Sequence, residues 1–134
     1  MTALFDSTHS VKKLTGADFE NFHPWKLKKK GCAVVLFYAN WCGHCQQFKS
    51  EYVKFADMSQ FVNVYAVDSD AQQGLLKAQK AAPHSPVKIQ GFPTIWMYKG
   101  GSPHHEYTGE RTVGALVADV AKMSCAPSRR VTKD

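Results

Sequence analysis

The stretch NWCGHCQQFK (residues 40–49) holds two cysteines separated by two residues, the best candidates for chemistry in this 134-residue chain. Such a pair can bind a metal ion, staple a fold or exchange electrons as a dithiol and a disulfide. Structural zinc usually takes four ligands, often from two pairs, whereas Cys32 and Cys125 each stand alone. The ligand count therefore predicts no metal site, neither zinc nor an iron–sulfur cluster.

The composition argues against a fold that depends on disulfides. Four cysteines among 134 residues are few for a disulfide scaffold, and 44% hydrophobic residues are enough to build a core. We therefore expect Cys32 to be a small buried residue and Cys125 a half-exposed free thiol, although a disulfide between them stays compatible with the sequence.

The net charge of +6 comes largely from residues 25–31 and 128–134. A nucleic-acid site is one interpretation, but a solvated loop and a chain terminus explain these charges more simply, so no nucleic acid is predicted as partner. No apolar run approaches the ~18–20 residues of a transmembrane helix. Residues 1–10 lack the features of a secretory signal, and residues 131–134 do not match a retention signal. We therefore expect the protein to be located in the cytoplasm, and in the endoplasmic reticulum lumen only if a leader was removed.

The cysteine pair follows directly on a predicted buried strand. Residues 33–39 form a continuous β-branched and aromatic run, and residues 42–58 carry apolar side chains at helical spacing. The members of this apolar face are Cys45, Phe48, Tyr52, Phe55 and Ala56. Cys42 then falls at a helix N-terminus, where free backbone N–H groups stabilise an anion such as a thiolate. We expect Cys42 to be an exposed nucleophile and Cys45 a buried resolving thiol, as thiol–disulfide exchange requires.

The remaining pattern predicts a mixed sheet with helices on both faces. The predicted strands are residues 11–14, 33–39, 62–67, 94–99 and 104–108, and the predicted helical segments are 16–22, 42–58, 70–82 and 112–123. The sequence GGSP, residues 100–103, marks a hairpin between the last two strands.

Four separated motifs carry a family resemblance. FYANWCGHC resembles FYAPWCGHC, the usual active-site signature of the thioredoxin-like domains of protein disulfide isomerases, and LTGADFENF, GFPT and YTGERT match in the same order over residues 11–124. The resemblance implies an α/β thioredoxin fold, with a central mixed sheet of about five strands and about four helices. It also implies an N-terminal extension (1–9), a thioredoxin-like domain (10–124) and a basic flexible tail (125–134).

The resemblance also implies roles for single residues. Cys42 would be the attacking thiolate, Cys45 the resolving thiol, and His44 a donor that makes the disulfide more oxidising than that of thioredoxin. Arg111, before the last helix, would act on the resolving thiol. The residues implied in substrate binding are Trp41, Gly43, Phe92, Pro93 and Thr94, with Pro93 as the cis-proline facing the cysteines.

Two departures from the family pattern occur together. The family keeps a buried carboxylate where this chain has Leu36, and a lysine where it has Ala66. Replacing both members of a buried ion pair by apolar residues can be neutral for stability. Because the carboxylate serves the family as a proton relay for the buried thiol, we expect slower resolution at Cys45.

The resemblance implies a thiol–disulfide oxidoreductase that forms, breaks or reshuffles protein disulfides through a mixed disulfide and needs no cofactor. Expected partners are cysteine-containing proteins and a recycling partner, either glutathione or an oxidase or reductase, with the protein itself a monomer. Two alternatives stay open. One is a binding or chaperone module with impaired redox activity, which Leu36 favours, and the other a reductive thioredoxin-like donor, against which His44 argues.

Overall fold

The centre of the sheet is β2 (Ala33–Tyr38), whose six residues are all buried, as its apolar run predicts. The computed structural model describes residues 3–6 and 9–125, and orders the strands β1-β3-β2-β4-β5. β1 (Lys12–Leu14) and β3 (Asn63–Asp68) run parallel to β2, whereas β4 (Thr94–Lys99) is antiparallel to it and β5 (Ser102–Tyr107) antiparallel to β4. The predicted mixed five-stranded sheet is confirmed.

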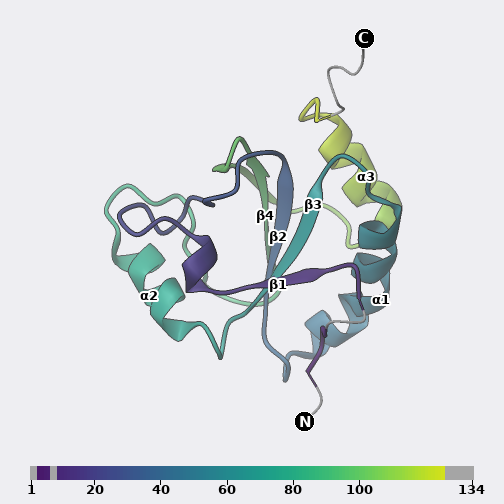
Figure 1. Ribbon diagram of the computed structural model, residues 1–134. Helices are drawn as coiled ribbons and strands as arrows, with labels where there is room; N and C mark the ends of the chain where they lie inside the picture. Colours follow the sequence, from purple (N-terminus) through teal and green to yellow (C-terminus); the bar gives the residue numbers. More distant parts are fainter. Residues whose placement is uncertain (1–2, 7–8, 126–134) are drawn as a thin grey trace.

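Helices cover both faces of this sheet. α1 (Gly43–Met58) and α3 (Val113–Ala121) lie on one face, and α2 (Gln73–Ala81) lies on the other (Figure 1). The predicted count of about four helices is slightly too high, because the segment after β1 forms only a short 3₁₀ helix (Gly16–Asp18), opened by a capping box from Thr15. The described residues therefore contain three α-helices.

Alternation along β2 divides the core into two layers. Val34, Leu36 and Tyr38 point to the face covered by α1 and α3, and the intervening residues point to the face covered by α2. All five residues predicted for the apolar face of α1 are buried. The first residues of α1 are thereby held beneath the end of β2, at the edge of the sheet where the cysteine pair lies.

The β4–β5 hairpin differs from its prediction in both turn and register. Gly100 and Gly101 alone form the turn, with φ of 65° and 83°, so β5 begins two residues earlier than predicted. Along the pair, Met97 lies opposite His105 but Tyr98 lies opposite Pro103, so one residue of β5, His104, is left over as a β-bulge.

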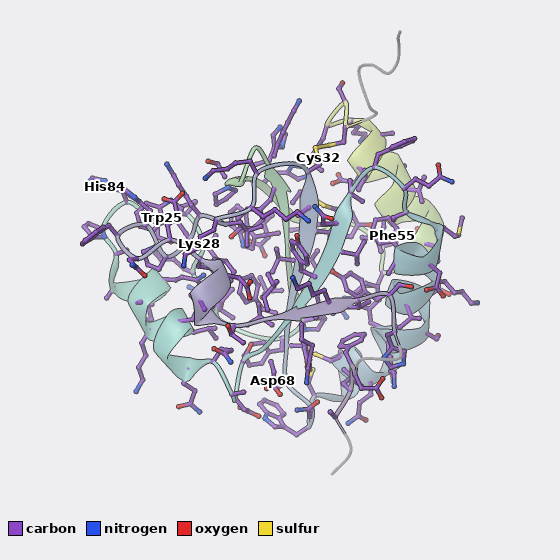
Figure 2. The ribbon with its side chains drawn as sticks, viewed as in Figure 1. Trp25, Lys28, Cys32, Phe55, Asp68 and His84 are labelled. Carbon is purple, nitrogen blue, oxygen red and sulfur yellow. A yellow bond between two sulfur atoms is a disulfide. The ribbon has the colours of Figure 1, made fainter. Side chains whose placement is uncertain are left out.

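A disulfide joins Cys32, just before β2, to Cys125, after α3. The two Cα atoms are 6.0 Å apart and the cysteines 93 residues apart in sequence, so the expectation of two free thiols is wrong. Cys32 lies at the end of the sheet near the end of α3 (Figure 2). Residues 126–134 of the predicted tail lie outside the described residues.

The segment before β1 also contributes to the core. Phe5 is fully buried and packs edge-on against Tyr38 and Tyr52, with ring centroids 5.1 and 6.0 Å away. Residues 1–9, predicted as an extension, therefore include side chains that belong to the main core. The boundary at residue 10 itself stays a prediction.

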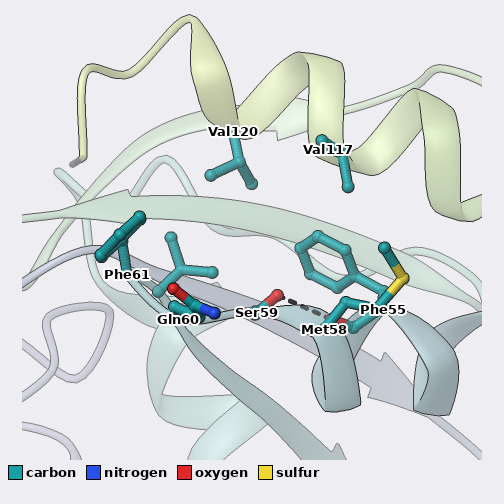
Figure 3. Close-up of a pocket in the computed structure, with 8 residues that line it drawn as sticks. Phe55, Met58, Ser59, Gln60, Phe61, Val117 and Val120 are labelled. Atoms are coloured by element: carbon teal, nitrogen blue, oxygen red, sulfur yellow. Dashed lines mark hydrogen bonds between the residues drawn. The ribbon is translucent and has the colours of Figure 1, made fainter.

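An apolar hollow separates the end of α1 from α3. It measures about 240 Å³, and Figure 3 shows Phe55, Met58 and Phe61 on one side and Val117 and Val120 of α3 on the other. Met58 and Phe61 are more than half exposed there. The hollow lies away from the cysteine pair, beyond the opposite end of α1.

Candidate active site

Cys42 is the N-cap residue of α1. Its backbone is extended, and its Sγ accepts a hydrogen bond from the backbone N–H of Cys45 at 3.3 Å. This N–H is one of those that a helix start leaves without an intrahelical partner. A thiolate at Cys42 would accept the same bond more strongly and would lie at the positive end of the helix dipole. The placement predicted from sequence is confirmed.

The predicted exposure of Cys42 is wrong. Only 7% of the residue is accessible, because the Phe92 segment before β4 packs over it and the Phe92 carbonyl oxygen lies 3.5 Å from its Sγ. Gly43, the next residue, is exposed and carries no side chain. A substrate sulfur must therefore reach a recessed Cys42 sulfur.

Cys45 is fully buried, as expected for a resolving thiol. Burial raises the pKa of its thiol to about 12, and the neighbouring Cys42 contributes to the rise. A backbone hydrogen bond at Ala39 and the positive charge of Arg111 act in the opposite direction. Both cysteines are free thiols here, so the structure represents the reduced pair.

The core beneath Cys45 is apolar at the two positions where the family pattern places charges. Leu36 and Ala66 are paired directly across β2 and β3, and both are fully buried. Tyr38 adds a buried hydroxyl to this layer, which has no hydrogen-bond partner among the described residues. Burial, with the charges of Asp68 and Cys45, raises the pKa of this hydroxyl, so Tyr38 stays protonated.

The residues predicted to contact substrate come from two segments of the chain that meet beside Cys42. The Phe92–Pro93 peptide bond is cis, and Thr94 begins β4, with its hydroxyl donating to the Gly91 carbonyl. Trp41 is 59% exposed, and its ring meets the edge of Phe92 at a centroid distance of 6.0 Å. The exposed Trp41 ring and the half-buried Phe92 ring thus form an aromatic rim beside the recessed sulfur.

His44 and Arg111 are less closely joined to the sulfurs. His44 is exposed, and within the described residues no hydrogen bond links it to Cys42. Arg111 is also exposed and lies just before Thr112, the N-cap of α3, from where its charge reaches Cys45. The catalytic roles implied for these two residues stay predictions.

Sequence reasoning missed the polar contacts that hold the active-site turn. Asn40 replaces the proline of the usual signature, and its side chain accepts from the Leu4 N–H at 2.8 Å and donates to Asp68 at 3.0 Å. The Trp41 indole N–H donates to Asp70 at 2.8 Å. The change from proline to Asn40 was the visible signal, but its partners lie 28 and 36 residues away along the chain.

Residues 3–6 and 9–125 show neither a metal site of three or more ligands nor a membrane-spanning helix. No group of three or more histidine, cysteine, aspartate and glutamate side chains converges there in a way suited to a metal ion. None of the helices described has the length and apolar character needed to cross a membrane.

The thioredoxin family model matches residues 10–122. Protein disulfide-isomerase A6 of Mus musculus is 33% identical over 136 residues, covering 100% of this chain and 28% of the relative. Protein disulfide-isomerase like 2-2 of Arabidopsis thaliana is 33% identical over 115 residues, covering 85% of this chain and 23% of the relative. The chain thus spans about a quarter of the length of these curated relatives.

A solved structure supports the same relationship. The first thioredoxin domain of mouse protein disulfide-isomerase A4 is 31% identical to this chain, with a TM-score of 0.64. The match covers 93% of this chain and 85% of that domain. The similarity therefore extends over one whole domain.

Proposed function

The chain belongs to the thioredoxin family, as a domain of the protein disulfide isomerase type, and we propose that it forms, breaks or reshuffles protein disulfides through the Cys42–Cys45 pair. Its relatives support thiol–disulfide oxidoreductase activity in general. One observation supports the specific role of the Cys42–Cys45 pair. The Cys42 sulfur lies at the start of α1 and accepts a hydrogen bond from the N–H of Cys45, whose own thiol is fully buried one turn further on.

The reductive direction starts at Cys42. Its thiolate attacks one sulfur of a substrate disulfide, which forms a mixed disulfide and releases the other substrate sulfur as a thiolate. Cys45 then loses its proton and attacks the Cys42 sulfur, so that the second substrate sulfur leaves. The substrate gains two electrons, and Cys42–Cys45 becomes a disulfide.

The oxidative direction reverses these steps. A substrate thiolate attacks Cys42 of the oxidised pair and displaces the Cys45 thiolate, and a second substrate thiolate then releases Cys42. The substrates are cysteine-containing proteins, and glutathione or a second redox protein restores the pair. The exposed Trp41 ring beside the half-buried Phe92 supports binding of a protein segment next to Cys42.

The proposal includes an oxidising compartment as the place where the protein acts. The Cys32–Cys125 disulfide supports an oxidising compartment over the cytoplasm, because structural disulfides persist mainly where thiols are not kept reduced.

A binding module with impaired redox activity is the second candidate. Apolar Leu36 and Ala66 support it, because neither side chain can carry a proton to or from Cys45. Client binding that survives replacement of both active-site cysteines by serine, with no exchange in the unchanged protein, would favour this candidate.

Trapping the mixed disulfide tests the proposal. The reduced Cys45→Ser variant is mixed with a peptide disulfide, and intact-mass spectrometry with peptide mapping follows the product. We expect the peptide to accumulate on Cys42, and to be released rapidly only when Cys45 is present. Equal release from the unchanged protein and Cys45→Ser would show that Cys45 does not resolve the intermediate.

A further inference from the structure

The β-bulge in β5 brings two neighbouring histidines together. In a regular strand, successive side chains point to opposite faces, so His104 and His105 would diverge. The extra residue of the bulge removes this alternation. The Nδ1 atoms of the two imidazoles lie 2.6 Å apart as a result.

Asp119 of α3 binds the other ring nitrogen, Nε2, of His105. Its Oδ2 lies 2.6 Å from His105 Nε2, and the carboxylate is less exposed than the imidazole. An ionised carboxylate only accepts hydrogen bonds, so His105 Nε2 carries a proton, and in the neutral ring Nδ1 keeps its lone pair. A carboxylate behind a histidine is the arrangement that orients metal-binding imidazoles.

We propose that His104 and His105 bind a divalent transition-metal ion through their Nδ1 atoms, with Asp119 positioning His105. Imidazole nitrogens are suitable ligands for Cu(II), which N and O sites bind most tightly among the divalent first-row metals, so Cu(II) is the ion we expect to bind best. This departs from the sequence-based prediction of no metal, which considered only the cysteines.

The surroundings suit a cation with water in its remaining positions. His104 is exposed, and His105 alone of the two lines an open hollow of about 360 Å³, together with Glu106, Glu110, Asp119 and Lys122. Three carboxylates outnumber one ammonium group there, so the local charge is negative. In the unbound state the His104 Nδ1–H donates to His105, and on metal binding that proton moves to the exposed Nε2 of His104. No electron is transferred, and the copper stays Cu(II).

The test is titration with Cu(II), followed by electron paramagnetic resonance and calorimetry in the full chain carrying Cys42→Ser and Cys45→Ser. The serines prevent the active-site thiols from binding or reducing copper, so the result does not depend on the proposed redox function. We expect one site of micromolar or tighter affinity and a spectrum showing two equatorial nitrogens. His104→Ala and His105→Ala should each weaken binding at least tenfold, and Asp119→Asn about tenfold.

His84→Ala is the matched control, since His84 is an exposed histidine on the loop after α2. It should change the affinity less than twofold. Affinities of His104→Ala and His105→Ala within twofold of the parent would overturn the proposal. An equal loss in His84→Ala would do the same, because it would indicate diffuse binding by surface imidazoles.

Discussion

The two cysteine pairs lie at opposite ends of β2 and differ in nearly every physical respect. Cys42 and Cys45 are three positions apart at the start of α1, beyond Tyr38, the last residue of β2. Tyr38 pairs with Asp68 of β3, which lies at the end of the sheet opposite Cys32 (Figure 2). Cys32 and Cys125 are 93 residues apart and join the other end of the strand to the segment after α3. One pair is reduced and the other oxidised in the same structure.

The difference follows from what each pair joins. A disulfide across 93 residues removes much conformational freedom from the unfolded chain, so it contributes mainly to stability. A disulfide between residues three apart closes a very short loop and stabilises far less. Its chemistry instead depends on the helix N-terminus at Cys42 and the burial of Cys45. Position in the fold, more than residue type, separates the proposed exchange role of one pair from the stabilising role of the other.

The largest expected difference between the pairs is in exchange rate. Cys42→Ser should lower the rate of reduction of a peptide disulfide by about 10³-fold or more, because it removes the nucleophile. The double variant Cys32→Ser/Cys125→Ser should stay within about threefold of the unchanged protein. Stopped-flow measurements under argon at 10 °C would compare them. A comparable loss in both variants would place exchange chemistry at both ends of the strand.

Stability should show the reverse order. Loop-closure entropy predicts that Cys32→Ser/Cys125→Ser lowers the free energy of unfolding by about 4–5 kcal/mol. Opening the oxidised Cys42–Cys45 pair by Cys42→Ser/Cys45→Ser should lower it by only about 2 kcal/mol. Urea denaturation of both variants and of the oxidised protein measures this contrast. Equal losses would mean that the long-range disulfide stabilises the fold no more than the short-range one.

The resolving step should depend steeply on pH. Burial, the largest cause of the raised Cys45 pKa, persists in the mixed disulfide, so the Cys45 thiolate fraction there should increase about tenfold per pH unit up to pH 9. Release of a labelled peptide from the Cys42 mixed disulfide should therefore accelerate about 100-fold from pH 7 to pH 9, as followed by fluorescence in a single turnover. A plateau below pH 8 would contradict the strong burial of this thiol.

Leu36→Glu places a carboxylate in the layer beneath Cys45, and so affects only the exchanging pair. We expect release at pH 7 to become about tenfold faster, because the carboxylate can take the thiol proton. The free energy of unfolding should fall by about 3 kcal/mol, because Ala66 offers the buried carboxylate no charge partner. Leu36→Gln is the matched control, because its side chain is of similar size but cannot accept the thiol proton. Faster release in both variants would attribute the effect to loosened packing.

Arg111→Ala should have the smallest effect. Its charge lowers the Cys45 pKa from an exposed position, so its loss should raise that pKa and slow release at pH 7 about threefold. Arg111→Lys should preserve most of the rate because it keeps the charge. Unchanged release in Arg111→Ala would mean that the arginine does not act on the thiol.

Local sequence patterns predicted the framework around the active site well. The apolar run before Asn40 forms the central strand, and the helical face of α1 buries the five residues expected of it. These features depend on periodicity within one element, which a single sequence displays directly. The placement of Cys42 at the helix start follows from them.

Features that depend on distant partners could not be predicted in the same way. Cys32 and Cys125 pair only because α3 ends near the start of β2, and Asn40 binds Leu4 and Asp68 only after the sheet has formed. The low exposure of Cys42 comes from the Phe92 segment, 50 residues away. Each depends on tertiary packing, which leaves no local pattern in the sequence.

Reduction potentials of both pairs test the central claim most directly. The protein would be equilibrated with glutathione buffers and thioredoxin-based couples, and each pair followed separately by alkylation and peptide mass spectrometry. We predict that Cys42–Cys45 titrates near −180 mV, as in an isomerase, whereas Cys32–Cys125 stays oxidised to below −300 mV. A common midpoint for the two pairs would contradict the division between one exchanging and one structural pair.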